Sequence, residues 1–223
     1  MSQEQWTAVD RYMTQMLVPP DPALDEALRA SAAAGLPAIN VSPNQGKLLM
    51  LLALLRGARS ILEIGTLGGY STIWLARGLA KGGRLITLEA DPKHAEIARS
   101  NIARAGVADV VELVLGKALD ALPRLAANGR GPFDLIFIDA DKPSNPDYFS
   151  WAMKLSQPGS LIIIDNVVRD GKVIDAASGD AGVRGVRRMN ELIAAEPRVI
   201  ATAIQTVGIK GYDGFAIALV TAG

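Results

Sequence analysis

The spacing of apolar residues changes near residue 60 of this 223-residue chain. Before that point, Trp6, Val9 and Met13 recur at the interval of an amphipathic helix. A second helix is predicted to begin at Asp21-Pro22, where the aspartate can cap the first turn and proline fits its first position. Residues 1–40 are therefore predicted to form an N-terminal helical segment.

From residue 60 onward, short apolar runs alternate with amphipathic stretches. The predicted strands are Ser60–Gly65, Arg84–Ala90, Val110–Leu115, Phe133–Ala140, Ser160–Asn166, Arg198–Val207 and Gly211–Val220. The predicted helices are Ser71–Ala80, Pro92–Ala105, Lys117–Ala127, Pro146–Leu155 and Val183–Ala195. Strands that are apolar throughout indicate a parallel sheet covered on both faces, and the short last link requires an antiparallel hairpin. The expected fold is α/β: a doubly wound, Rossmann-like, seven-stranded, mostly parallel sheet with a C-terminal antiparallel hairpin, in a single domain over residues 1–223.

Composition narrows the chemistry that the chain can carry. It has no cysteine and one histidine, so thiolate nucleophiles, disulfides and multi-histidine metal sites are excluded, and a metal would need oxygen ligands. We expect that histidine, His94, to be a surface residue on a helix away from the functional site. The formal net charge is zero, which removes the electrostatic footprint of a nucleic-acid-binding protein.

Neither export nor membrane insertion is expected. Residues 1–10 are polar and acidic, unlike the basic tip and apolar run of a signal peptide. The most apolar stretch, Leu48–Leu55, lies between Lys47 and Arg56 and is far too short to span a bilayer. The sequence therefore predicts a cytoplasmic protein without a membrane partner.

A glycine-rich turn is predicted after the first strand, between Glu63 and Ser71. In open α/β sheets, ligands bind beyond the carboxyl ends of the strands, and glycines let the backbone approach them closely. Gly65 and Gly69 are therefore candidate cofactor-binding residues. Glu89, at the end of the second predicted strand, can accept hydrogen bonds from both ribose hydroxyls of an adenosine.

Two nucleoside cofactors fit this arrangement. A nicotinamide dinucleotide would need Gly-x-Gly-x-x-Gly to place its pyrophosphate on a helix N-terminus. The spacing here is Gly65-x-x-Gly68-Gly69, and Glu63 would repel a pyrophosphate but suit the cationic amino-acid end of S-adenosylmethionine. S-adenosylmethionine is therefore the predicted cofactor, and a purely structural tight turn is the alternative.

Oxygen donors end the fourth and fifth predicted strands, which we expect to be neighbours. Asp139 ends the fourth and Asp165-Asn166 end the fifth, so these side chains should emerge at the same rim of the sheet. Two carboxylates and one amide leave coordination positions free for water and two adjacent substrate oxygens. This donor set suits Mg²⁺, with Mn²⁺ or Ca²⁺ as substitutes. The alternative is that these aspartates only cap helices or turns.

Lys142 follows Asp139 closely enough to reach an oxygen bound to the same metal. It is therefore the predicted catalytic base, which would take a proton from the substrate. The alternative is a surface lysine paired with Asp141.

Taken together, these segments resemble the class I, cation-dependent O-methyltransferases, the family that includes caffeoyl-CoA and catechol O-methyltransferases. The resemblance runs from about Ile39 to Val220. It rests on Asn40-Val41, Leu62 through Thr66, Gly69-Tyr70-Ser71, Leu88-Glu89, Asp139-Ala140-Asp141-Lys142 and Asp165-Asn166. The family implies methyl transfer from S-adenosylmethionine, and its members are commonly homodimers.

The resemblance also implies roles for individual residues. Asp139, Asp165 and Asn166 would be metal ligands, and Lys142 the base. The residues expected around the cofactor are Val41, Glu63, Gly65, Thr66, Gly69, Tyr70, Ser71, Glu89, Ala118, Asp139, Asp141 and Tyr148. The mammalian catechol enzyme follows its first ligand aspartate with His-Trp, whereas this chain has Ala140-Asp141. We therefore expect the substrate wall to come from the N-terminal segment and the loop Val168–Gly182.

The predicted function is methyl transfer from S-adenosylmethionine to a hydroxyl of a metal-chelated aromatic vicinal diol of catechol, caffeoyl or flavonoid type. The alternatives are a methyltransferase for another small molecule or RNA without metal chelation, a nicotinamide dehydrogenase, and a cofactor-binding regulator without catalysis. The Asn/Asp-Pro-Pro-aromatic motif typical of amine-directed RNA and protein methyltransferases does not occur in the sequence.

Overall fold

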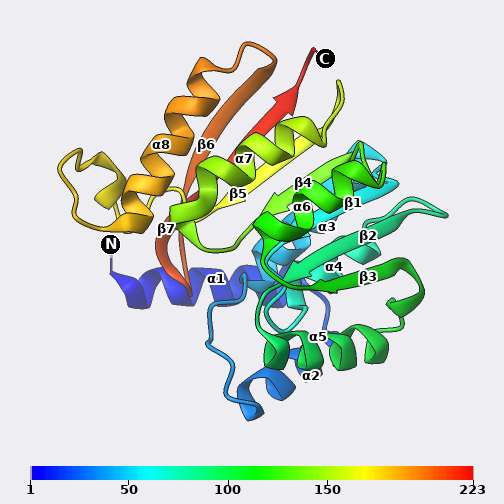
Figure 1. The fold of residues 1–223 in the computed structure, drawn as a ribbon. Coiled ribbons are helices and arrows are strands. Elements are labelled where there is room, and N and C mark those ends of the chain that lie inside the picture. Colours follow the sequence, from blue (N-terminus) through cyan, green and yellow to red (C-terminus); the bar gives the residue numbers. More distant parts are fainter. Residues whose placement is uncertain (1, 223) are drawn as a thin grey trace.

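The computed structural model describes residues 2–222, whose strands form one seven-stranded sheet (Figure 1). The strands are β1 (Ser60–Ile64), β2 (Arg84–Glu89), β3 (Val111–Leu115), β4 (Leu135–Ile138), β5 (Leu161–Asp165), β6 (Val199–Gly208) and β7 (Gly211–Val220). Their order is β3-β2-β1-β4-β5-β7-β6. β1 to β5 pair in parallel, and β7 runs antiparallel to both β5 and β6. The predicted doubly wound, Rossmann-like sheet with a C-terminal hairpin is confirmed.

Eight α-helices surround the sheet over residues 2–222. They are α1 (Gln3–Leu17), α2 (Pro22–Ala33), α3 (Pro43–Arg56), α4 (Tyr70–Arg77), α5 (Pro92–Arg104), α6 (Ala118–Ala127), α7 (Asn145–Lys154) and α8 (Ala181–Ala195). Aspartates cap several of them: Asp21 accepts hydrogen bonds from the first N–H groups of α2, and Asp91 does the same for α5. None of these helices is long and apolar enough to cross a membrane.

Alternate side chains of the parallel strands enter two separate cores. Leu62 and Ile64 of β1 pack with α6, α7 and α8 on one face, whereas Ile61 packs with α2, α3 and α4 on the other. Burial on both faces explains why these strands are apolar throughout. Because the strands are parallel, the carboxyl ends of β1, β2, β4 and β5 lie side by side at one end of the sheet.

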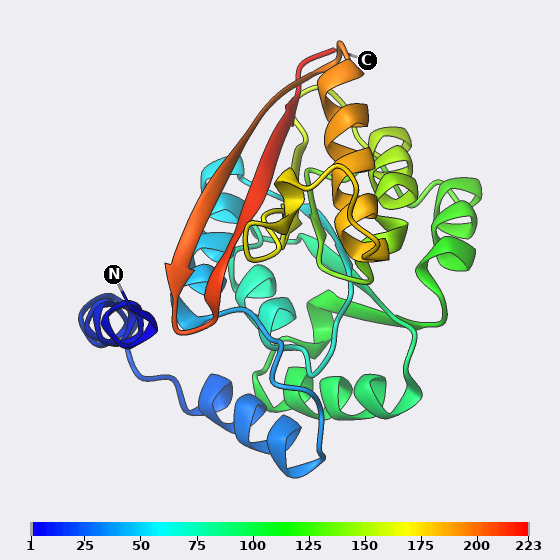
Figure 2. The ribbon, with the colours of Figure 1, turned by 90° about the vertical axis from the view of Figure 1, so that its left-hand side faces the viewer.

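Helix α1 contributes nothing to these cores. None of its residues is buried, and Val9, Met13 and Met16 are 51%, 42% and 66% exposed. The helix lies beside the turn of the β6–β7 hairpin (Figure 2) and contacts β6 and α3. The apolar side chains of Val9, Met13 and Met16 are therefore not covered by the rest of residues 2–222.

Several element boundaries differ from the prediction by a few residues. The strand predicted over Phe133–Ala140 is the shorter β4, because the ladder stops at Ile138 and only the Asp139 N–H continues it, donating to the Ile64 carbonyl at 2.9 Å. The helix predicted to end at Ala80 ends at Arg77. The chain therefore leaves the sheet at Asp139, where the candidate site begins.

Gly185 of α8 packs directly on the backbone that carries Lys142. A Cβ at Gly185 would lie 2.2 Å from the Lys142 carbonyl oxygen, so Gly185→Ala must push α8 away from the 3₁₀ turn Lys142–Ser144. We expect the free energy of unfolding to fall by about 1–3 kcal/mol, which lowers Tm by roughly 2–10 °C in thermal unfolding. Gly179→Ala is the control, because a Cβ there meets nothing within 4 Å. A Gly185→Ala protein as stable as this control would contradict the packing argument.

Candidate active site

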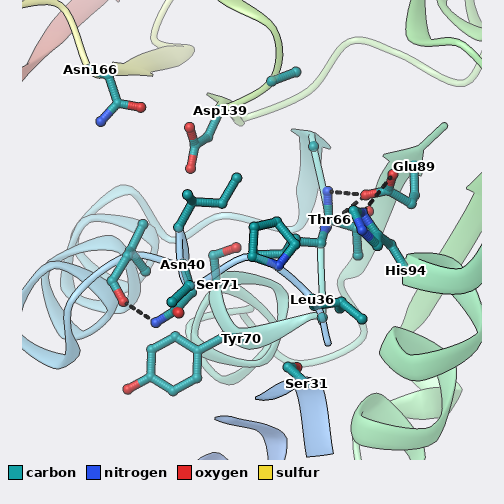
Figure 3. Close-up of a pocket in the computed structure, with 18 of the residues that line it drawn as sticks. Ser31, Leu36, Asn40, Thr66, Tyr70, Ser71, Glu89, His94, Asp139 and Asn166 are labelled. Atoms are coloured by element: carbon teal, nitrogen blue, oxygen red, sulfur yellow. Dashed lines mark hydrogen bonds and ion pairs between the residues drawn. The ribbon is translucent and has the colours of Figure 1, made fainter. Parts of the chain in front are cut away.

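A cavity of about 880 Å³ opens at the carboxyl edge of the sheet (Figure 3). The strand tips contribute Gly65 and Thr66 after β1, Glu89 at the end of β2 and Ala90 after it, Asp139 after β4 and Asn166 after β5. The rest of the wall includes residues of α2, the segment 36–41 that follows it, and the hairpin turn Ile209-Lys210. The N-terminal segment therefore lines part of the cavity, and its role as a substrate wall stays a prediction.

Gly65 allows the tips of β1 and β4 to lie against each other. Its φ is +100°, and a Cβ at this position would lie 2.1 Å from the carbonyl oxygen of Asp139. The Gly65 N–H donates to the carbonyl of Leu88 at 3.0 Å, which ties the tip of β2 to the same place. The glycine turn after β1 and Asp139 after β4 therefore lie against each other through their backbones.

Glu89 is held by backbone donors at the end of β2. Its Oε2 accepts hydrogen bonds from the N–H groups of Thr66 at 3.3 Å and Leu67 at 2.8 Å, and Oε1 accepts one from Asp91 at 2.8 Å. The residue is largely buried but still lines the cavity. A carboxylate fixed at this position fits the ribose hydroxyls of an adenosine.

His94 also lines the cavity, with Nδ1 3.7 Å from Oε1 of Glu89 (Figure 3). The prediction of a surface histidine away from the site is therefore wrong. The cause is the short link between β2 and α5: the helix begins at Pro92, so its first turn places His94 beside the Glu89 carboxylate.

Glu63 lies behind the cavity wall. Its side chain is fully buried and accepts hydrogen bonds from the hydroxyls of Ser71 at 2.6 Å, Thr87 at 2.7 Å and Thr72. Burial raises the pKa of Glu63 to about 7, although the three hydroxyls oppose this rise. Ser71 lines the cavity and connects Glu63 to it. Direct contact between Glu63 and a cofactor remains a prediction.

The aspartates predicted as metal ligands end neighbouring strands. Ile138 of β4 pairs with Ile164 of β5, so Asp139 and Asp165 follow at equivalent positions. Asp139 and Asn166 line the cavity, and Asp165 is buried directly before Asn166. The predicted convergence of these strand tips at one rim is confirmed.

The donor set at this corner fits a hard divalent cation. Oδ2 of Asp165 accepts a hydrogen bond from Gln45 at 2.7 Å, and burial followed by the charge of Asp139 raises the pKa of Asp165 to about 7, with Lys142 opposing. A cation would offset the repulsion between these carboxylates. No three His, Cys, Asp or Glu side chains gather as a metal site among residues 2–222. Asn166 follows Asp165 directly and lines the cavity, so its amide oxygen remains the third predicted ligand.

Lys142 lies beside Asp139 rather than Asp141. Its Nζ donates to Oδ1 of Asp139 at 2.8 Å, and its side chain is 10% exposed. Asp141 accepts hydrogen bonds from the hydroxyls of Ser144 and Tyr148, and burial together with the Tyr148 bond raises the pKa of Tyr148. The alternative of a surface pair with Asp141 does not form, and Lys142 is placed at the corner where the metal is predicted.

Most residues predicted around the cofactor line this cavity. They are Val41, Gly65, Thr66, Tyr70, Ser71, Glu89, Ala118, Asp139, Asp141 and Tyr148. Among the remaining predicted site residues, Lys142 and Asn166 line it, whereas Glu63, Gly69 and Asp165 are buried beneath its surface.

Three basic residues line the cavity without having been predicted there: His94, which was expected away from the site, Arg169 and Lys210. Arg169 belongs to the loop Val168–Gly182, which was expected to form the substrate wall, so its place in the cavity could have been predicted from the sequence. Lys210 reaches the cavity only because the long hairpin folds back along the sheet, which no local sequence pattern indicates.

The chain is similar to known O-methyltransferases over nearly its whole length. A sequence model described as O-methyltransferase matches residues 16–219. A catechol O-methyltransferase from Niastella koreensis is 56% identical over 220 residues, which cover 99% of this chain and 100% of that protein. An O-methyltransferase from Bacillus cereus, solved in complex with SAH, is 63% identical with a TM-score of 0.98, covering 99% and 100% of the two chains. The O-methyltransferase TomG from Streptomyces achromogenes, involved in tomaymycin synthesis and solved with SAM, is 55% identical with a TM-score of 0.96 over 100% of both chains. The chain belongs to the O-methyltransferase family.

Proposed function

We propose that this O-methyltransferase transfers the methyl group of S-adenosylmethionine to one hydroxyl of a small aromatic vicinal diol, such as a catechol, that is held by a divalent cation. Mg²⁺ is the first candidate, with Mn²⁺ or Ca²⁺ as substitutes. The observation that carries the proposal is the pair of neighbouring strand tips that places Asp139 and Asn166 in the wall of one cavity, with Asp165 buried directly before Asn166. The name of the Niastella koreensis relative supports a catechol-type acceptor.

The part of the cavity between Glu89 and Ser71, the cofactor half, suits a nucleoside with a cationic amino-acid end. Glu89 would accept the ribose hydroxyls, and the turn at Gly65 allows the backbone to come close. Ser71, backed by the buried Glu63, offers a hydroxyl at the other end. S-adenosylmethionine supplies a methyl group on a sulfonium, and the bonding pair of the broken S–C bond stays on sulfur while the acceptor oxygen takes the methyl.

The acceptor half would orient the diol and remove its proton. Asp139, Asp165 and Asn166 would hold the cation, whose positive charge favours ionisation of a bound hydroxyl. Lys142, whose Nζ lies 2.8 Å from Oδ1 of Asp139, would take up the proton that this hydroxyl loses, once the lysine has given up its own proton. The reaction neutralises a charge rather than creating one, so the main contribution of the protein is to hold oxygen and methyl at attack distance.

Asp165→Asn should separate the metal role from cofactor binding, because Asp165 lies beneath the cavity surface and asparagine keeps its shape. With Mg²⁺ and a catechol, we expect kcat to fall by at least about 100-fold, since a charged ligand is lost. Calorimetric Kd for S-adenosylhomocysteine should change by less than about threefold. Excess EDTA should have the same effect on the unchanged protein, and Asp109→Asn, at an exposed position, is the control. Full turnover in EDTA would exclude the metal role.

Lys142→Arg tests the proton acceptor. The guanidinium keeps the positive charge beside Asp139 but cannot give up or take a proton in a protein. We expect kcat to fall by about 100- to 1,000-fold with little change in KM or in cofactor affinity. Lys154→Arg, on α7 over the ring of Trp151, provides a matched control. A kcat within about threefold of the unchanged protein would assign the proton to another acceptor.

We also propose that the protein forms a homodimer through an apolar face on α1, α3 and β6. The face consists of Val9, Tyr12, Met13, Met16 and Leu17 of α1, Leu51 and Leu55 of α3, and Ile200 and Ile204 of β6, all exposed. Leu51 and Leu55 continue the side of α3 that begins at Asn44, which hydrogen-bonds to α1. β6 is the edge strand of the sheet, and contiguous exposed apolar surface of this kind marks interfaces.

Light scattering after size-exclusion chromatography tests the dimer. We expect a mass twice that of the 23.5 kDa chain, and the Met16→Glu/Ile204→Lys protein should elute as a monomer, because burying these charges at the interface is costly. Ile174→Glu is the control: Ile174 is equally apolar and exposed but lies in a turn that contacts α8. A monomeric unchanged protein, or a dimer that survives the double substitution, would refute this arrangement.

A further inference from the structure

Two cations of the cavity have no carboxylate partner within the part of the chain that the structure describes. Arg169 follows Asn166 in the loop after β5, and Lys210 lies in the β6–β7 turn; both line the cavity together with Asp139 and Asn166. Neither forms an ion pair with any carboxylate of residues 2–222. Lys142, by contrast, is paired with Asp139. The cavity therefore carries positive charge that the carboxylates of residues 2–222 do not neutralise by ion pairing.

Arg169 is fixed by its backbone. Its φ is +58°, a conformation that side-chain-bearing residues rarely adopt, and its N–H donates to Oδ1 of Asp213 at 3.0 Å. The Nε atom is buried and has no hydrogen-bond partner within residues 2–222. A buried donor without a hydrogen-bond partner costs free energy. The Nε–H group of Arg169 is therefore free to donate to an acceptor on a bound ligand.

Asp180 is the carboxylate that senses the charge of Arg169, but it is occupied elsewhere. Its Oδ1 accepts hydrogen bonds from the N–H groups of Val183 and Gly182 at the start of α8. These bonds are the main reason that the pKa of Asp180 is lowered, and Arg169 contributes less. Asp180 therefore caps a helix rather than neutralising Arg169.

Lys210 is placed by contacts between the hairpin and the N-terminal helix. Asp10 of α1 accepts a hydrogen bond from the Ile209 N–H at 2.9 Å, and Gln3 donates to the carbonyl of Gly208 at 2.8 Å. The Lys210 ammonium donates to the carbonyl of Ala38 at 2.9 Å. Partial burial lowers the pKa of Lys210, as expected for a cation that has lost water without gaining a carboxylate.

The charges of the cavity are thus divided between its two halves. Glu89 ends β2, and Asp139 with Asp141 follows β4 at the predicted metal corner, whereas the two unpaired cations lie in the loop after β5 and in the hairpin turn. We propose that the diol acceptor carries a carboxylate, which Arg169 and Lys210 bind. This inference rests on the proposed function and adds the substrate class: an anionic aromatic diol.

A pair of acceptors of nearly equal shape provides the test: 3,4-dihydroxybenzoate and its neutral amide, 3,4-dihydroxybenzamide. We expect kcat/KM of the unchanged protein to be about tenfold higher for the carboxylate, and the difference to shrink at high salt. Arg169→Gln and Lys210→Met should each lower kcat/KM for the carboxylate by about five- to tenfold, mainly through KM, and change it less than about twofold for the amide. Lys172→Met removes an exposed positive charge that does not line the cavity, and it should change neither value.

Each other outcome overturns the inference in a recognisable way. Equal kcat/KM for the two acceptors would show that Arg169 and Lys210 do not bind the carboxylate of the substrate. Equal losses on both acceptors in Arg169→Gln and Lys210→Met would assign these residues to folding. Weaker calorimetric binding of S-adenosylhomocysteine in these variants would assign them to the cofactor instead. If the unchanged protein methylates neither diol with Mg²⁺, the proposed function itself falls, and the inference with it.

Discussion

The contact between the tips of β1 and β4 constrains the whole site. Gly65 has no Cβ, and only for that reason can its backbone lie against the carbonyl of Asp139. The cofactor turn and the first metal-ligand candidate are consequently joined through backbone atoms rather than through flexible side chains. For a transfer in which charge is neutralised, the geometry of approach matters more than electrostatic stabilisation, and a rigid shared edge supplies that geometry.

The two halves of the site are built by different means. The nucleoside half comes from consecutive strand–turn–helix units, so Gly65, Ser71 and Glu89 are close in sequence as well as in space. The acceptor half would combine Asp139 and Asn166 with segments far apart in the chain, namely the loop after β5 and the hairpin turn. These outer segments carry no strand of the parallel sheet, so their side chains can differ while the cofactor half stays the same.

The parallel sheet and the metal corner could be predicted because each depends on one general rule. Strands buried on both faces are apolar throughout, which identified the sheet. The carboxyl ends of parallel strands lie at the same end of a sheet, and this rule correctly predicted that Asp139 and Asp165 lie close together. The direction of a side chain at a strand end was harder to foresee. Glu63 shares the orientation of Ile61, toward the face covered by α4, so its carboxylate lies under that helix and is bonded to Ser71 and Thr72. His94 and Lys210 depend on how tightly a helix or hairpin folds back, which the residues alone do not specify.

The β6–β7 hairpin has a practical consequence for handling the protein. Its turn is held by Gln3 and Asp10, so a bulky tag fused ahead of α1 would pull on the very loop that displays Lys210. β7 then runs antiparallel to β5 and carries the chain away from the cavity to the opposite edge of the sheet (Figure 1). An affinity handle or immobilisation linker is therefore better attached after Val220, where it leaves acceptor selectivity undisturbed.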